Sequence, residues 1–151
     1  MKLNNLFKMQ AERNKDLKVL TNLDEYKLNA RKLLALNVRV GNLANATKCF
    51  KYWEDSESTD PDYILQKYIN ALSCILTVGM FKGYTDIDSI EIKSNDYCLS
   101  DQFLNLYVDI NDLLTTSSKD HYVTLLEDFL SIGKSLGLTE EIIIDAYLKQ
   151  A

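Results

Sequence analysis

Two pairs of polar residues interrupt the most apolar, helix-periodic stretches of the sequence. Arg39 and Asn42 lie in the first stretch, and Lys67 and Asn70 lie in the second, three residues apart in each pair. Side chains at this spacing share a helix face, so each pair predicts one polar spot on a long helix. Guanidinium and ammonium groups bind phosphate directly, and amides add hydrogen bonds. Two interpretations follow. The four side chains satisfy one another in a polar core, or they hold a phosphate or nucleotide without catalysing a reaction.

The elements that carry these pairs are predicted to be long helices. In residues 31–53 the apolar side chains recur with the spacing of a buried helix face, at Leu33, Leu36, Val40, Leu43 and Ala44. Residues 64–79 have the same character. The first stretch ends in an aromatic and basic cluster at residues 49–53 (CFKYW), which is unusual for plain surface.

The remaining pattern predicts an all-α fold: one domain over residues 1–151, built as a bundle of five to six helices. The helices are expected at about residues 3–20, 24–49, 61–82, 101–116, 117–136 and from 139 onward. The expected N-terminal caps are Asn4 or Asn5, Thr21 or Asn22, Asp60 ahead of Pro61, Ser100, Ser117 or Ser118, and Thr139. Residues 54–62 should form a polar loop. Residues 85–99 should form an irregular connection with one helical turn, with a short strand as the alternative.

Composition excludes several classes of function. The net charge is −5 and the sequence pI is about 4.9, which argues against nonspecific binding of nucleic acid. Cys49, Cys74 and Cys98 lack the spacing of a zinc site and are expected to be free thiols in a reducing cytosol. His121 begins a helix and is expected at the surface or in a cap. The N-terminus has no apolar leader pattern, and no apolar run approaches the roughly 20 residues of a membrane span. We therefore expect a cytoplasmic protein without a membrane partner.

Beside this reading, the sequence resembles a known family, the all-α dimeric dUTPases. These are relatives of the MazG-like nucleoside triphosphate pyrophosphohydrolases. The resemblance rests on Gly41, Leu43, Ala44, Asn45 and residues 49–53 of the first stretch. In the second it rests on Ile64, Leu65, Tyr68, Leu72, Leu76 and Gly79. Residues 6–12 and 136–149 are similar to the family as well, so the resemblance spans nearly the whole chain. It implies an all-α fold, a homodimer and the hydrolysis of dUTP to dUMP and pyrophosphate.

The chain departs from this family at the positions that bind Mg²⁺. The family uses an E-x-x-E pair on one helix and an E-x-x-D pair on the next, and these positions here hold Arg39, Asn42, Lys67 and Asn70. Three accompanying positions, two usually acidic and one usually His, hold Ala46, Gln66 and Ser73. Mg²⁺ prefers carboxylate oxygens, and neither Arg nor Lys can be a ligand. We therefore expect no metal, no cofactor and no catalytic residues.

The resemblance also implies a nucleotide pocket. The family's M-Q motif falls on Gln10, where the amide helps read uracil, and Asn45, Lys51 and Trp53 keep the family's residues at the end of the first long helix. In the family, the Trp lies against the base and the Lys faces phosphate. For Lys51 and Trp53 the alternative is a core Trp with a half-exposed Lys, and for Gln10 it is a half-exposed helix Gln. The family's closing segment, rich in Asn, Arg and Gln, has no counterpart before Ala151.

The function expected from these features is that of a pseudoenzyme. We expect a dUTPase-like homodimer that acts by binding an unidentified protein, as a phage or mobile-element regulator in the host cytoplasm, with uracil nucleotide binding left open. One alternative is a weak or altered nucleotide hydrolase that uses Glu54, Asp55 or Asp62. Another is a nucleotide sensor whose ligand changes the affinity for a partner.

Overall fold

The computed structural model describes residues 1–150 and contains six helices in that range. The helices are α1 (Asn4–Asn14), α2 (Glu25–Thr47), α3 (Pro61–Lys82), α4 (Leu99–Thr115), α5 (Lys119–Ser135) and α6 (Glu140–Lys149). The described residues hold no strand, only an isolated bridge between Lys2 and Ser89. The predicted all-α class is confirmed.

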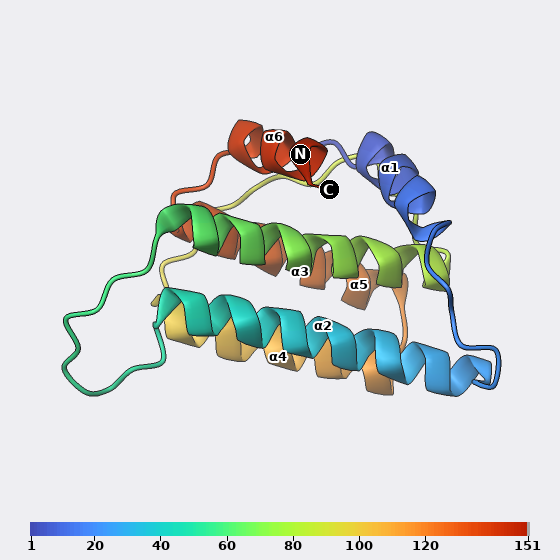
Figure 1. Ribbon diagram of the computed structural model, residues 1–151, viewed down its shortest axis with the longest axis horizontal. Helices are drawn as coiled ribbons and strands as arrows, with labels where there is room; N and C mark the ends of the chain where they lie inside the picture. Colours follow the sequence, from blue (N-terminus) through green and yellow to red (C-terminus); the bar gives the residue numbers. More distant parts are fainter. Residues whose placement is uncertain (151) are drawn as a thin grey trace.

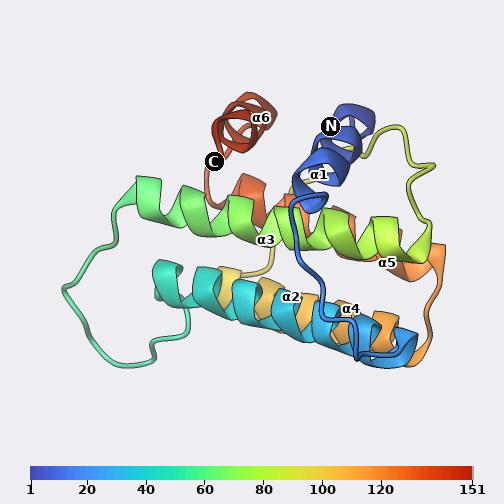
Figure 2. The ribbon, with the colours of Figure 1, turned by 45° about the vertical axis from the view of Figure 1, so that its right-hand side comes forward.

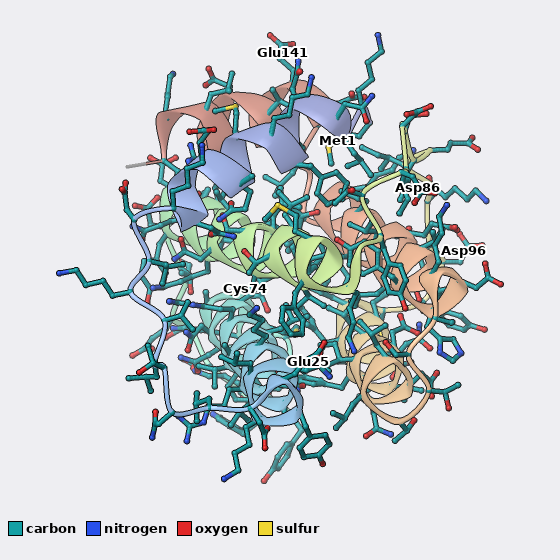
Figure 3. All side chains as sticks on the ribbon, turned by 90° about the vertical axis from the view of Figure 1, so that its right-hand side faces the viewer. Met1, Glu25, Cys74, Asp86, Asp96 and Glu141 are labelled. Atoms are coloured by element: carbon teal, nitrogen blue, oxygen red, sulfur yellow. The ribbon has the colours of Figure 1, made fainter. Side chains whose placement is uncertain are left out.

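Four of the helices form a bundle, and the other two cover one side of it. Helix α2 packs against α3, α4 packs against α5, and the two pairs meet through α2–α4 and α3–α5 contacts. Helices α1 and α6 lie across α3 on the side away from α2 (Figures 1 and 2). Seen from the end, the four bundle helices occupy the corners of a square, with α1 and α6 above it (Figure 3). The connection between α2 and α3 projects beyond the bundle (Figure 1).

The predicted apolar stripe of α2 is the face that enters the core. Leu33, Leu36, Val40 and Leu43 are buried, and Ala44 packs at the core's edge. Helix α3 lies at the centre, in contact with α1, α2, α5 and α6. It is also the helix that length and composition would allow to cross a membrane, with a mean hydropathy of 1.3 over its most apolar window. Within the described residues, it packs against four other helices.

Helices α3 and α5 approach closely at two reciprocal contacts. Tyr68 of α3 lies over Gly133 of α5, and Tyr122 of α5 lies over Gly79 of α3. Each hydroxyl reaches a carbonyl of the opposite helix: Tyr68 Oη donates to Phe129 O at 3.0 Å and Tyr122 Oη to Ile75 O at 2.7 Å. Both tyrosines are fully buried, and burial raises the pKa of each phenol. The glycines supply the space that the rings fill.

Three predicted caps are confirmed. Asp60 accepts a hydrogen bond from the amide of Asp62, Ser118 from that of His121, and Thr139 from that of Ile142. For α2 the cap is Asp24, which accepts from Lys27 N at 2.8 Å, so the expectation of Thr21 or Asn22 is wrong.

Two other cap predictions are also wrong. Helix α1 starts directly after Leu3 and α4 directly after Cys98, so Asn4, Asn5 and Ser100 do not occupy the capping position, and neither helix has a side-chain cap. The start of α1 is set instead by pairing of the preceding residues with 88–90, where Leu3 N donates to Asp88 O at 2.9 Å.

Three boundaries differ from the sequence pattern. Helix α1 ends at Asn14, and the apolar residues Leu17, Val19 and Leu20 that seemed to extend it are exposed. Helix α2 ends at Thr47 because Lys48 adopts a left-handed conformation (φ 59°). Residues 85–98 form an irregular connection, as predicted from the sequence, but they contain no helical turn.

Candidate functional site

The four positions that the family resemblance assigns to metal ligands, Arg39, Asn42, Lys67 and Asn70, lie on α2 and α3, the most extensively packed pair of helices. Arg39 is exposed, and Asn42, Lys67 and Asn70 are half-buried. The polar residues therefore lie at the solvent-exposed edge of the α2–α3 contact. A polar core would require both pairs to be buried within the bundle, and they are not. Because water reaches this edge, the two cations do not need partners inside the protein.

The side chains at these positions turn to different partners. The Lys67 ammonium lies 4.8 Å from the ring centroid of Tyr63, one turn earlier on α3. Arg39 faces Cys74 of α3, labelled in Figure 3. Burial raises the pKa of the Cys74 thiol, and the nearby Arg39 charge opposes the rise. Asn70 accepts from Gln150 Nε2 at 3.0 Å. A self-satisfied polar core would require hydrogen bonds among these four side chains. Within residues 1–150, no such hydrogen bond is present.

The donor set does not fit Mg²⁺. Among the described residues, no group of three or more His, Cys, Asp or Glu side chains converges in a geometry that could hold a metal ion. The positions that would supply anionic oxygens present a guanidinium, an ammonium and two amides. Asn can offer a neutral oxygen, but two cations repel a divalent ion. No reaction step through a metal follows from this site.

Asn70 belongs instead to a polar cluster that α1, α3 and α6 build together. The Gln150 side chain, at the end of α6, accepts from Arg13 Nη1 at 3.0 Å and from Ser73 Oγ at 2.9 Å, and it donates to Asn70. Ser73 is the position to which the resemblance assigns a His. Arg13 and Gln150 were not singled out from the sequence, because their significance depends on α6 returning to lie beside α1.

A groove of about 510 Å³ opens beside this cluster, between α3 and α6. Its lining mixes apolar and polar side chains: Leu65, Ile69 and Ala146 with Gln66, Asn70 and Gln150. Asp62 and Lys149 add one charge of each sign. A mixed lining of this kind suits a small organic molecule or an extended side chain.

The four residues predicted for a nucleotide pocket do not come together. Gln10 is buried on α1, where its Oε1 accepts from Tyr147 Oη at 2.7 Å and its Nε2 donates to Asn14 at 2.9 Å. Asn45, Lys51 and Trp53 lie at and beyond the C-terminal end of α2, toward the projecting connection (Figure 1). The Gln10 amide is therefore engaged inside the protein rather than free to read a base.

The aromatic cluster at the end of α2 is largely solvent-exposed. Trp53 is 49% exposed and Tyr52 is 94% exposed, and their rings meet edge to face with centroids 5.0 Å apart. Phe50 joins them at 6.2 Å from Trp53. Lys51 pairs with Asp55, and its ammonium lies 5.7 Å from the Trp53 ring. Trp53 is thus not a core residue.

The acids considered for an altered hydrolase are dispersed. Asp55 is neutralised by Lys51, Glu54 is exposed in the projecting connection, and Asp62 stands in the first turn of α3 at the mouth of the groove. His121 contributes no catalytic pair, because its Nδ1 lies 2.6 Å from Thr116 O beside the start of α5.

Comparison with known proteins identifies the family. A family model described as dUTPase matches residues 2–151. Curated proteins and solved structures gave no match to the chain. The match covers nearly the whole sequence and agrees with the all-α fold, so the chain belongs to this dUTPase family.

Proposed function

We propose that this chain is a catalytically inactive member of the dUTPase family that acts by binding another protein. The observation that supports the proposal is the donor set on α2 and α3: Arg39, Asn42, Lys67 and Asn70 occupy the positions to which the resemblance assigns four carboxylates. Hydrolysis of a nucleoside triphosphate in this family depends on Mg²⁺ to neutralise phosphate charge and to activate water. A site that repels the metal loses both contributions.

The magnitude of the change supports inactivity rather than a weakened activity. Exchanging four anions for two cations and two neutral amides alters the local charge by about six units. One unlike pair of charges 4 Å apart is worth about 4 kcal/mol at an effective dielectric constant of ~20. The loss of one ligand leaves weak binding, but six units of the wrong sign abolish it.

The exposed aromatic cluster, Phe50, Tyr52 and Trp53, is the surface that best fits a protein partner. Tyr and Trp are enriched among the residues that dominate binding energies at protein interfaces. All three rings are solvent-accessible and pack against one another at their edges. As part of the same proposal, such a protein would act as a phage or mobile-element regulator in the host cytoplasm, a context that only the resemblance implies.

A homodimer is part of the same proposal, and α2 and α4 offer a surface for it. Leu34 and Val38 of α2 and Leu104 and Val108 of α4 are each more than half exposed. They lie opposite the buried stripes of their helices and therefore face away from the bundle. Helix α4 lies beside α2, since Tyr107 Oη reaches Asn37 O at 3.4 Å. We call these four residues the outer face. A second copy of this chain would cover it, as the family's dimers imply.

The test of inactivity is pyrophosphate release from dUTP with Mg²⁺ and with Mn²⁺. The wild type should give no turnover above the protein-free background. The quadruple variant Arg39→Glu, Asn42→Glu, Lys67→Glu, Asn70→Asp serves as the control. It should bind Mn²⁺ by electron paramagnetic resonance, whereas the wild type should not. Turnover by the wild type that follows the protein through purification would refute the proposal.

The partner surface is tested by affinity capture from the host cell with matched variants. Tyr52→Ala/Trp53→Ala should lose a captured protein that the wild type and Leu17→Ala both retain, because Leu17 is exposed but lies away from the cluster. Capture that is equal with all three proteins would show that the aromatic cluster is not the partner surface.

A further inference from the structure

The Gln150 carboxamide is recognised at both of its ends by side chains from two other helices. Its oxygen accepts hydrogen bonds from the Arg13 guanidinium of α1 and the Ser73 hydroxyl of α3, and its nitrogen donates to the Asn70 oxygen of α3. The three bonds are 2.9–3.0 Å long. We call Arg13, Ser73 and Asn70 the cradle. A group held in this way is bound as a ligand is bound, although it belongs to the chain itself.

The cradle is held in place largely without Gln150's side chain. The Arg13 guanidinium lies 4.3 Å from the Tyr147 ring centroid, and its Nη2 donates to Tyr147 O at 2.8 Å and to the backbone oxygen of Gln150 at 3.2 Å. Ser73 and Asn70 are three residues apart on α3 and share a face. Removing the Gln150 carboxamide would therefore leave two donors and one acceptor in nearly the same positions.

The arrangement of donors and acceptor defines the chemistry that fits. Two donors, one of them charged, converge on a single oxygen, and an acceptor faces the neighbouring N–H group. A planar primary carboxamide satisfies all three groups at once. A carboxylate would satisfy the two donors, but the Asn70 amide would have to turn its Nδ2 toward the second oxygen. The groove between α3 and α6, which Asn70 and Gln150 both line, gives a ligand access to the cradle.

We propose that the Arg13–Ser73–Asn70 cradle is a binding site for primary carboxamides that the chain blocks with its own Gln150. The site fills from the groove only when the Gln150 side chain leaves. Gln150 thus acts as an autoinhibitory plug, and a small molecule or a side chain that bears a carboxamide competes with it. The proposal goes beyond the loss of catalysis, because it assigns a ligand class to the cradle that requires neither a metal nor a reaction.

The experiment uses the full chain and propionamide, which reproduces the end of a Gln side chain. Gln150→Ala should bind propionamide, seen as saturating NMR shifts of the Ser73 and Asn70 backbone amides and of the Asn70 side-chain amide. The affinity should exceed that of the wild type by tenfold or more, because in the wild type the ligand must displace Gln150. Equal shifts in the wild type and in Gln150→Ala would overturn the proposal.

Two control variants isolate the cradle from the groove. Adding Ser73→Ala to Gln150→Ala removes one donor and should weaken propionamide binding by about tenfold. Gln66→Ala removes another glutamine that lines the groove but lies outside the cradle, and it should behave as the wild type does. Binding created by Gln66→Ala would assign the effect to the groove and overturn the proposal.

Propionate distinguishes a carboxamide site from an anion site. If Gln150→Ala binds propionate as tightly as propionamide, the cradle is an anion site and the proposal fails. Should Gln150→Ala detach α6, as shown by loss of the α6 amide signals, Gln150→Ser is used in its place, since its shorter side chain also vacates the cradle. In either variant, well-dispersed NMR signals from the α6 amides would show that α6 is still folded and docked.

Discussion

Asp109 of α4 is a buried acid placed beside another acid. It is 7% exposed, one of its carboxyl oxygens has no hydrogen-bond partner among residues 1–150, and Asp128 of α5 faces it. Asn105 donates to Asp128 Oδ2 at 2.9 Å. Burial first, then the hydrogen bond and charge of Asp128 and the charge of Asp112, raise the pKa of Asp109 to about 8. At neutral pH Asp109 therefore holds the proton.

This proton makes stability depend on pH. Between pH 3.8, the ordinary pKa, and about 8, the folded state keeps a proton that the unfolded chain releases. The free energy of unfolding should therefore fall as the pH rises through this window, by at most about 1.4 kcal/mol per pH unit. Solvent near the half-exposed Asp128 reduces the slope. Urea unfolding at pH 5, 6, 7 and 8 measures it.

Asp109→Asn is the matched variant for this pH dependence. Its amide keeps the volume and a donor toward Asp128 but has no proton to lose, so its stability should vary less between pH 5 and 8. Asp96→Asn, an exposed acid in the irregular connection, should retain the wild-type slope. A wild-type slope that persists in Asp109→Asn would contradict the assignment of the proton.

At the scale of single residues, the sequence predicted which helix each polar residue occupies better than it predicted which residues it contacts. Helical periodicity predicted two polar pairs on two long helices, Arg39 with Asn42 and Lys67 with Asn70. In the structure these pairs lie on the adjacent helices α2 and α3. Their partners do not follow, because Tyr63, Cys74 and Gln150 are reached only after side-chain directions and the return of α6 are set. The family resemblance could suggest a pocket role for Gln10, but it could not show that Tyr147 would use its amide.

At the scale of elements, the paired glycines of α3 and α5 decide how closely these helices approach. A Cβ at Gly79 would collide with the Tyr122 ring, and a Cβ at Gly133 would collide with the Tyr68 ring. Gly79→Ala and Gly133→Ala should each lower the free energy of unfolding by roughly 1–3 kcal/mol, because buried rings in a packed core have no free space to move into. Chemical denaturation measures the effect.

A double variant checks the cause of this loss. In Tyr122→Ala the space over Gly79 is empty, so adding Gly79→Ala should cost little beyond the loss of the ring. Additive losses from the two substitutions would show that the clash is not responsible and that the glycine acts through the backbone of α3 alone.

Element boundaries show where local sequence is sufficient. Asp60, Ser118 and Thr139 cap their helices through side-chain oxygens that accept backbone amides, a strictly local interaction that can be read from sequence. The start of α1 is not local, since Leu3 pairs with the backbone of Asp88 far along the chain. The end of α1 was misread for the same reason: Leu17 continues the apolar pattern, but no other element covers it.

At the scale of the whole molecule, the outer face of α2 and α4 is where we propose that a second copy of the chain docks. If a second copy covers Leu34, Val38, Leu104 and Val108, then Val38→Lys/Val108→Lys should give a monomer, because burying unpaired like charges in an apolar interface is costly. Sedimentation velocity measures the mass. Leu17→Lys, an exposed apolar residue away from this face, should remain dimeric. A wild type that sediments as a monomer at micromolar concentration would contradict the homodimer.

The contact of Arg13 with residues 147 and 150 has a consequence for the order of folding. This contact joins the two ends of the described chain, so it can form only after the intervening helices have docked. The α4–α5 hairpin, in contrast, requires the closure of only a short loop. Helices α1 and α6, which cover one side of the bundle, should therefore dock late in folding. In native-state hydrogen exchange, the amides of α1 and α6 should exchange through openings that cost less free energy than global unfolding. Such openings would release the half-buried Gln150 carboxamide while the four central helices stay folded.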